Sequence, residues 1–420
     1  MKLALIGAGQ RGMIYANYAY DSKNVDIVAV VEPDETRRKV AAKSFHVPKD
    51  RQFASSEDFF ALGKIADAII IASMDRDHYK QSMKALELSY DILLEKPISP
   101  DPGECLNIQE RANEKGCMVT VCHVLRYTSF FIKLKEIIDS KELGKVISIQ
   151  HNENIGNFHM AHSFVRGNWR RSDLSSSLIM QKSCHDMDIL AWLANSNTKR
   201  IASFGGLQFF KEENAPANST DRCLHCPAAK GCRFDARKAY LPIRGSWPAM
   251  VLTQDQTVEG IEKALEEGPY GRCVYRCDND VCDHQVVLIE FDNDIKVSFH
   301  LSGFTNKISR TIKVMCEHGE IRGDAEQNLI EITHFASNQV DEYSQTVIHT
   351  QIDEGGHGGG DVRLMDDFLS NLEAKNKSSI SSIDKSVESH LMAYAAEEAR
   401  RTGCVVDVKE LRKRFQSSKQ

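Results

Sequence analysis

The chain has 420 residues, of which 42% are hydrophobic and 27% charged, as is usual for soluble globular proteins of two or three domains. Its 53 Lys and Arg against 59 Asp and Glu give a formal net charge of −6, which excludes a basic surface for nucleic acid. The first apolar run, residues 3–8, is too short for a secretion signal, and no other stretch reaches the length of a membrane span. We therefore expect a cytoplasmic protein that acts on a small molecule.

Strand and helix patterns alternate over the first 123 residues. Short apolar runs predict strands at 2–6, 25–31, 66–72, 91–94 and 118–122, and helices are expected at 13–20, 36–45, 77–88 and 103–115. Such alternation is typical of a parallel sheet with right-handed crossover connections. Residues 1–123 are therefore predicted to form an α/β domain.

The pattern changes after residue 123. A helix is predicted at 130–138, an extended segment at 145–155, β-rich stretches at 285–301 and 311–335, and closing helices at 361–374 and 385–401. Asp292-Asn293-Asp294 is a turn-forming tripeptide between two apolar runs, which indicates a hairpin. Residues 124–420 are thus expected to form a second, α+β domain built on an antiparallel sheet.

A glycine-rich turn joins the first predicted strand to the first helix. In Gly7-x-Gly9-x-x-Gly12 the glycines leave room for a pyrophosphate, and the helix presents free N–H groups to it. Glu32 ends the second predicted strand, where a carboxylate can accept hydrogen bonds from ribose hydroxyls. A carboxylate there repels a 2′-phosphate, so NAD is favoured over NADP, and Arg37-Arg38 keeps NADP as the alternative.

Two further segments resemble a known enzyme family. Ser73-Met74-Asp75-Arg76-Asp77-His78 and Leu94-Glu95-Lys96-Pro97 each follow a predicted strand. Both resemble the cofactor and active-site segments of the Gfo/Idh/MocA family, which comprises glucose-fructose oxidoreductase, inositol dehydrogenase and rhizopine-catabolism proteins. The resemblance continues through residues 123–127 and 183–188.

The resemblance implies an N-terminal Rossmann domain and an open antiparallel sheet that often mediates a homodimer or homotetramer. It also implies hydride transfer at a sugar or cyclitol hydroxyl. With the glycine motif, it predicts that the dinucleotide contacts Gly7, Gly9, Gln10, Arg11, Gly12, Glu32, Ser73, His78, Glu95 and Lys96.

Lys96 and His185 are the leading catalytic candidates. Lys96 follows an apolar strand at the carboxyl edge of the predicted sheet, where its ammonium can polarise a hydroxyl. His185 has a side chain that titrates near neutral pH, so it suits removal of the hydroxyl proton. The alternatives are a solvated surface lysine and a histidine held by Asp188.

Lys182, His185 and Asp186 share one face of a predicted helix, which makes Lys182 a third catalytic candidate and Asp186 and Asp188 substrate ligands. Inositol dehydrogenases commonly carry an acid four positions before this histidine, where Gln181 stands here, so the substrate remains open. Further substrate contacts are predicted from Arg126, Asp280, His284 and His357. Turn or cap chemistry is the alternative for the strings around Asp280 and His357.

Five of the twelve cysteines lie between Cys223 and Cys277. Cys223, Cys226 and Cys232 offer three thiolates in one loop, and Cys277 or Cys273 offers a fourth, which predicts a closed structural zinc site. Such a site would fix an irregular insertion at 214–278. Free thiols, a disulfide and an iron–sulfur cluster are the alternatives.

These residues lead to three functional hypotheses. The first is an NAD(H)-dependent oxidoreductase of a sugar, sugar derivative or cyclitol. The second is redox-neutral glycoside cleavage or epimerisation, in which bound NAD oxidises one sugar carbon transiently and is regenerated. The third is a dinucleotide-binding sensor, against which the presence of both Lys96 and His185 argues.

Overall fold

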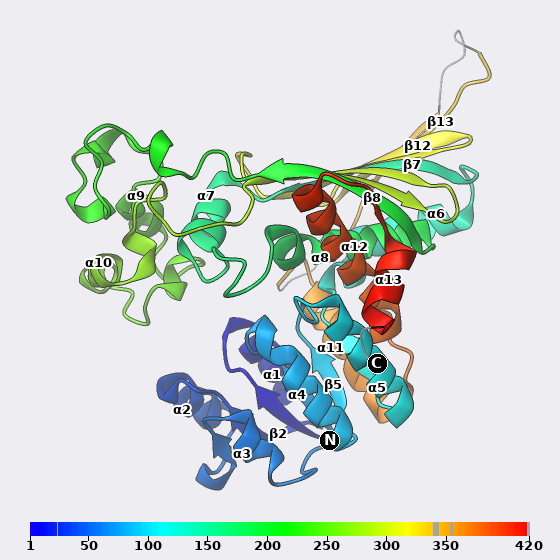
Figure 1. Cartoon of the computed structure of the whole chain (residues 1–420). Coiled ribbons are helices and arrows are strands. Elements are labelled where there is room, and N and C mark those ends of the chain that lie inside the picture. Colours follow the sequence, from blue (N-terminus) through cyan, green and yellow to red (C-terminus); the bar gives the residue numbers. More distant parts are fainter. Residues whose placement is uncertain (23, 339–343, 353–355, 418–420) are drawn as a thin grey trace.

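The computed structural model describes residues 1–22, 24–338, 344–352 and 356–417 (Figure 1). Its N-terminal part contains a six-stranded parallel sheet in the order β3-β2-β1-β4-β5-β6. The strands are β1 (Lys2–Ile6), β2 (Asp26–Val31), β3 (Gln52–Phe53), β4 (Ala68–Ile71), β5 (Asp91–Leu94) and β6 (Val119–Val121). The strand order reverses between β1 and β4, and open α/β sheets bind ligands at the carboxyl ends of the strands at such a point.

Helices connect these strands, as the alternating pattern predicts. They are α1 (Gln10–Asp21), α2 (Glu35–Ser44), α3 (Ser56–Phe60), α4 (Asp75–Glu87) and α5 (Pro102–Lys115). Local chemistry sets their ends: the Asp101 carboxylate accepts the N–H groups of Gly103 and Glu104 at the start of α5, and Gly116 ends it in the left-handed region. The predicted α/β domain is confirmed.

The second sheet has nine strands in the order β14-β13-β12-β11-β7-β10-β9-β8-β15. They are β7 (Val146–Asn154), β8 (Thr198–Gly206), β9 (His284–Phe291), β10 (Lys296–Ser302), β11 (Ser309–Cys316), β12 (Gly319–Asp324), β13 (Leu329–His334), β14 (Gln345–His349) and β15 (Val406–Asp407). The β9–β10 hairpin is confirmed. One pair departs from the expected antiparallel pattern, because β7 and β10 run parallel, as the long chain segment between them allows.

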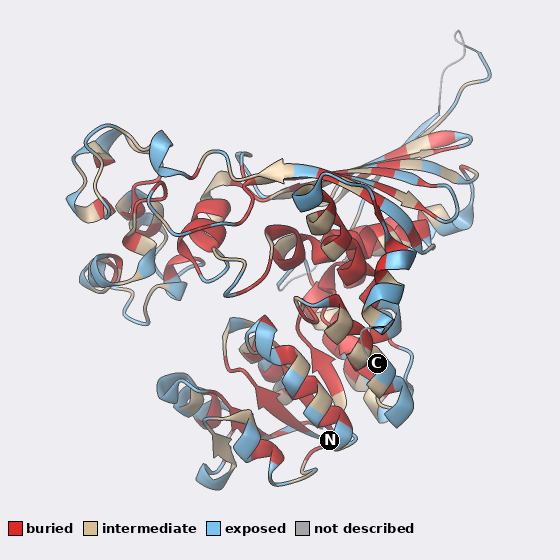
Figure 2. Ribbon diagram, in the orientation of Figure 1, coloured by how far each residue is buried: buried red, intermediate tan, exposed pale blue. Residues whose placement is uncertain are grey.

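Helices cover one face of this sheet. They include α6 (Ser129–Ser140), α8 (Leu178–Ala194), α12 (Ile383–Thr402) and α13 (Val408–Ser417). Helix α11 (Gly360–Glu373) instead packs on α1 and joins the apolar core of the first domain. Helices α8 and α12 pack on each other between the large sheet and the first domain (Figure 1). Most residues of α8 are buried, including the charged Asp186 and Asp188, and Figure 2 shows a mostly red helix. Charges buried this deeply need partners.

The insertion lies between β8 and β9. It contains α9 (Ala236–Tyr240) and α10 (Val258–Glu267) and has a small apolar core of its own, which includes Tyr240, Ile261 and Leu265. This unit packs beside α7 (Asn157–His159) (Figure 1). No helix in the described ranges is both long enough and apolar enough to cross a bilayer.

Candidate active site

The glycine-rich turn between β1 and α1 is closely packed, which explains its residues. Gly7 has φ +91°, and a Cβ added there would lie 2.5 Å from the backbone of Ala72. A Cβ on Gly12 would lie 2.0 Å from the Gly7 carbonyl oxygen, whereas Gly9 faces open space. The turn borders a cleft of about 390 Å³ that Glu32, Ser73 and Arg37 also line. Its size and position fit a dinucleotide.

Glu32 is buried at the end of β2. Its carboxylate accepts the N–H of Ala8 at 2.8 Å and that of Asp34 at 3.1 Å, so it is fixed beside the glycine turn. Arg38 donates to the carbonyl oxygens of Glu32 and Pro33, whereas Arg37 lines the cleft. Of the two arginines that leave NADP as the alternative cofactor, Arg37 is therefore the one positioned to bind a 2′-phosphate.

His78 is a buried support behind the cleft. Its Nδ1 lies 2.8 Å from the Pro97 carbonyl oxygen and its Nε2 lies 3.3 Å from that of Ser73. The Ser73 hydroxyl donates to Gln81 at 2.7 Å. His78 thereby ties the start of α4 to the turn that follows Lys96.

Arg11 and Glu95 contact each other across the glycine turn. Arg11 Nε donates to Glu95 at 2.8 Å, and its other nitrogens donate to Asp361 of α11 at 2.6 and 3.0 Å. Burial raises the pKa of the Glu95 carboxyl, but Arg11 and Lys96 outweigh burial and lower it. The two predicted cofactor ligands thus form a charged network with Asp361, and their contact with a dinucleotide stays a prediction.

Lys96 and His185 come from different domains and lie close together. Lys96 follows β5, and its Nζ donates to the carbonyl oxygen of Gln181 at 2.9 Å, one helical turn before His185 in α8. The Gln181 side chain points away, since its amide donates to Asp75 and Ser175. The backbone of α8 therefore holds the Lys96 ammonium beside His185.

His185 is 6% exposed. Burial lowers the pKa of its imidazole well below 6.5, and the positive charge of Lys96 lowers it further. Its Nδ1 has no hydrogen-bond partner within the described ranges. The ring is therefore neutral at ordinary pH, so the expectation that it titrates near neutral pH is wrong, and its unpartnered Nδ1 is buried.

Lys182 takes part in a buried network of charges. Its ammonium lies 3.3 Å from Glu153, which also pairs with Arg310 at 2.5 Å. Arg310 and His151 both contact Asp186, at 2.9 and 2.8 Å. Asp186 is completely buried, and it supports the Lys182 region through Arg310. Its direct contact with substrate stays a prediction.

Arg126 and Asp188 form a closed pair in the interior. Two hydrogen bonds of 2.6 and 2.7 Å join the guanidinium to the carboxylate, and the Trp192 ring lies 5.6 Å from the Arg126 Cζ. Because each charge is neutralised by the other, the pair supports α8. Binding of substrate by either residue stays a prediction.

Asp280, His284 and His357 lie in three separate settings. Asp280 accepts both the N–H and the hydroxyl of Ser172, at 2.7 Å each, and His284 contacts the buried Asp283. His357 alone lies near the catalytic pair, with its ring centroid 6.3 Å from that of His185. Asp280 therefore ties its segment to Ser172, 108 residues away in sequence, whereas His357 begins a glycine turn and lies near His185.

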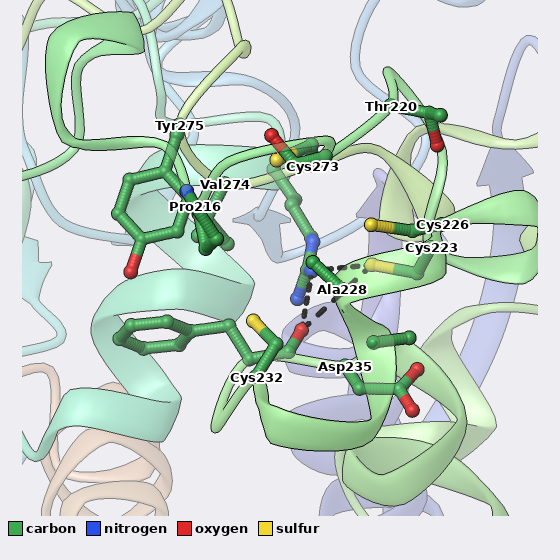
Figure 3. Close-up of a pocket in the computed structure, with 14 residues that line it drawn as sticks. Pro216, Thr220, Cys223, Cys226, Ala228, Cys232, Asp235, Cys273, Val274 and Tyr275 are labelled. Carbon is green, nitrogen blue, oxygen red and sulfur yellow. Dashed lines mark hydrogen bonds between the residues drawn. The ribbon is translucent and has the colours of Figure 1, made fainter.

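The cysteines do not form the predicted zinc site. Cys223, Cys226, Cys232 and Cys273 line one pocket (Figure 3), whereas Cys277 lines another hollow with Phe210. Arg166, only 1% exposed, reaches into the first pocket and donates to the Cys223 sulfur at 3.4 Å and to the Phe234 carbonyl at 2.7 Å. Across the described part of the chain, no three His, Cys, Asp or Glu residues are grouped to hold a metal ion. A buried guanidinium shares the space that the ion would need.

Several site residues were missed from the sequence: Glu153, His159, Arg310 and Asp361. Glu153 and Arg310 lie on the strands β7 and β11, which pair directly. The alternation of side chains along a strand shows which residues lie on the same face of the sheet. It does not indicate that a pair of charged residues lies on the buried face. The pairing of Asp361 with Arg11 could not be found from the sequence, because the two residues are 350 positions apart.

Comparison with known proteins matches both parts of the chain. A family model described as "Oxidoreductase family, NAD-binding Rossmann fold" matches residues 1–123, and its partner, "Oxidoreductase family, C-terminal alpha/beta domain", matches residues 135–408. The chain belongs to the Gfo/Idh/MocA oxidoreductase family. The family is thus confirmed, with the NAD-binding Rossmann domain that the glycine motif and the resemblance predict.

Relatives within the Gfo/Idh/MocA family are distant. The oxidoreductase YteT of Bacillus subtilis is 25% identical over 363 residues, 83% of each chain. An inositol 2-dehydrogenase of Corynebacterium glutamicum is 26% identical over 206 residues, which are 48% of this chain and 56% of that protein. An oxidoreductase from Agrobacterium radiobacter, solved with NAD+, L-tartaric acid and magnesium, is 14% identical with a TM-score of 0.69, covering 98% of this chain and 99% of its own. At that identity the likeness shows a shared fold alone.

Proposed function

We propose that this protein is an NAD(H)-dependent oxidoreductase that transfers a hydride to or from a hydroxyl-bearing carbon of a sugar, sugar derivative or cyclitol. The observation that carries the proposal is the meeting of Lys96 and His185 beside the carboxyl end of the dinucleotide-binding sheet. Relatives named inositol 2-dehydrogenase support the substrate class. The glycine turn fits the cofactor, because Gly9 faces open space, and the tight packing of Gly7 and Gly12 against backbone brings the turn close to the start of α1.

In this mechanism, His185 removes the proton from the substrate hydroxyl. Its imidazole is neutral at ordinary pH and can therefore accept a proton. Lys96 donates a hydrogen bond to the same oxygen and stabilises negative charge that develops there. NAD, when bound, supplies the hydride acceptor. Lys182, held by Glu153, lies one residue after Gln181 and contacts other hydroxyls of the substrate.

The test is formation of NADH, measured at 340 nm, with a panel of sugars and cyclitols that includes myo-inositol and D-glucose. His185→Ala should lower turnover by about two to four orders of magnitude, the usual contribution of a positioned acid–base group. His318→Ala is the matched control, since His318 is exposed. Binding of NAD should be the same in all three proteins.

Two results would count against the proposal. The first is near-normal turnover of His185→Ala, which would place the base elsewhere, with Lys182 or His284 as the next candidates. The second is conversion of a glycoside without net NADH by protein purified with bound nicotinamide. That result would support redox-neutral glycoside cleavage in place of a dehydrogenase.

A further inference from the structure

The proton that His185 takes from the substrate must reach bulk water before the next turnover. Burial lowers the pKa of the His185 imidazole, and the positive charge of Lys96 lowers it further, so the proton is readily given up again. Only 6% of His185 is exposed, which restricts direct exchange with bulk water. A neighbouring group that accepts the proton and is open to solvent would therefore speed turnover.

Two imidazoles of the described residues lie next to that of His185, one buried and one exposed. The His123 ring is 5.7 Å away between centroids and is completely buried, so it offers no exit. The His357 ring is 6.3 Å away at an interplanar angle of 52°, and 40% of its side chain is exposed. One bridging water can span such a separation between two imidazoles. Of these two neighbours, His357 is the one that connects His185 to solvent.

Asp361 orients the His357 ring. The Nδ1 of His357 lies 3.3 Å from the Asp361 carboxylate, which is in the first turn of α11. Burial raises the pKa of the Asp361 carboxyl, but hydrogen bonds with His357 and Arg11 outweigh burial and lower it, so it is ionised at neutral pH. An ionised acceptor at Nδ1 favours the tautomer in which Nδ1 carries a proton. In that tautomer the Nε2 lone pair of His357 can accept a second proton.

Arg11 provides the opposing charge at the same ring. Its Nη1 lies 3.4 Å from the Nδ1 of His357, while its two terminal nitrogens donate to the Asp361 carboxylate at 3.0 and 2.6 Å. The carboxylate stabilises a protonated His357, and the guanidinium destabilises it. A group that passes a proton on must both accept and release it, and these two opposed charges suit that role.

The backbone fixes the position of the His357 side chain. His357, Gly358 and Gly359 have positive φ angles of 50°, 58° and 79°, so the chain turns sharply before α11. A Cβ on Gly360 would lie 2.4 Å from the carbonyl oxygen of Val124, which shows how closely this turn is packed. The short helix Val124–Tyr127 contacts both α11 and α8. The turn is thereby held beside the catalytic helix.

We propose that His357 is the relay that carries the substrate proton from His185 to bulk water, through one bridging water. The proton leaves the substrate hydroxyl for His185, passes to the Nε2 of His357 and is released to solvent, while the electron pair of the C–H bond leaves with the hydride to NAD. Reduction of a carbonyl uses the same path in reverse. This inference rests on the proposed function, because it assumes that His185 receives a proton.

The experiment follows the hydride and the proton separately in a single turnover. Stopped-flow absorbance records NADH, and a pH indicator in weakly buffered solution records the protons that reach bulk water. In the wild type both signals should rise together. In His357→Gln, which keeps a polar side chain beside Asp361, NADH should form at the wild-type rate, whereas proton release should lag by at least about tenfold. In steady-state turnover, imidazole used as the buffer should restore the rate of this variant, because it replaces the missing relay.

His334→Gln is the matched control. His334 is a second partly exposed imidazole beside a carboxylate, 3.2 Å from Glu142, and this variant should behave as the wild type does. Proton release without a lag in His357→Gln, or a loss of turnover that imidazole does not restore, would overturn the relay. Absence of NADH from the wild type with every sugar is a different result, because it overturns the proposed function and the relay with it.

Discussion

Replacing one member of the buried Arg126–Asp188 pair should destabilise the protein more than replacing both. Asp188→Leu leaves the Arg126 guanidinium, 3% exposed in the intact pair, with only carbonyl partners: Ile380 at 3.1 Å and Lys385 at 3.4 Å. It removes two charge-assisted hydrogen bonds of 2.6 and 2.7 Å. An uncompensated buried charge of this kind costs about 3 to 5 kcal/mol of unfolding free energy.

The double variant Arg126→Met/Asp188→Leu should recover most of that loss. Burial raises the pKa of the Asp188 carboxyl even though Arg126 opposes the rise, so the ionised pair carries a desolvation penalty that its attraction only partly offsets. An apolar pair avoids the penalty. We expect its unfolding free energy to lie within about 1.5 kcal/mol of the wild type.

The assay is urea unfolding followed by tryptophan fluorescence, since Trp192 packs on the Arg126 guanidinium. Asp188→Asn serves as a near-isosteric variant that keeps hydrogen bonds but removes the charge, and it should fall between wild type and Asp188→Leu. A loss below about 1 kcal/mol for Asp188→Leu, or a double variant no more stable than the single one, would refute this account of the pair.

Three further predictions concern the cofactor, acid stability and assembly. Because Glu32 repels a 2′-phosphate, NAD should bind at least about tenfold more tightly than NADP in calorimetric titration, and equal affinity would assign Arg37 the phosphate. His390, whose Nε2 accepts the Ile98 N–H at 2.8 Å, has its pKa lowered to about 3 by burial and by His123. Below pH 6.5 the His390 imidazole therefore binds a proton in the unfolded chain but not in the folded protein. The contribution of neutral His390 to the unfolding free energy is complete above pH 6.5 and falls by about 2 kcal/mol at pH 5.0. In urea unfolding at pH 7.5 and 5.0, His390→Gln should shrink the pH dependence by that amount, and an unchanged difference would contradict the assignment. Phe204 and Leu288 are exposed on the uncovered face of the large sheet, so we expect light scattering to show a homodimer or homotetramer. Leu288→Lys should weaken this assembly, and a monomeric wild-type protein would contradict the prediction.

Much of the fold could be predicted from local patterns. Alternating strands and helices, the turn at 292–294 and the Gly7–Gly12 motif depend on neighbouring residues, and the structure has all three. The parallel pairing of β7 with β10 could not be predicted, because the two strands are about 150 residues apart in sequence. No local pattern in the connecting segment indicates that the two strands are neighbours.

The site was predicted less completely, for the same physical reason. Lys96 and His185 were found because each lies in a short recognisable segment, and their proximity depends on one contact to the backbone of Gln181. The charges of Arg126 and Asp188 were assigned to substrate because sequence does not show that they pair with each other. The thiol spacing predicted zinc, but Arg166 is distant in sequence and occupies part of the same pocket.

Transfer of deuterium tests the central claim most directly. The best substrate from the sugar panel, deuterated at the carbon that is oxidised, would be mixed with NAD in a single turnover, and the nicotinamide analysed by mass spectrometry. We predict that deuterium appears on the nicotinamide, that Lys96→Ala and His185→Ala each slow its appearance by about two to four orders of magnitude, and that the double variant is far less than multiplicative. Transfer at the wild-type rate in His185→Ala, or deuterium released only to water, would contradict the proposed hydride transfer at Lys96 and His185.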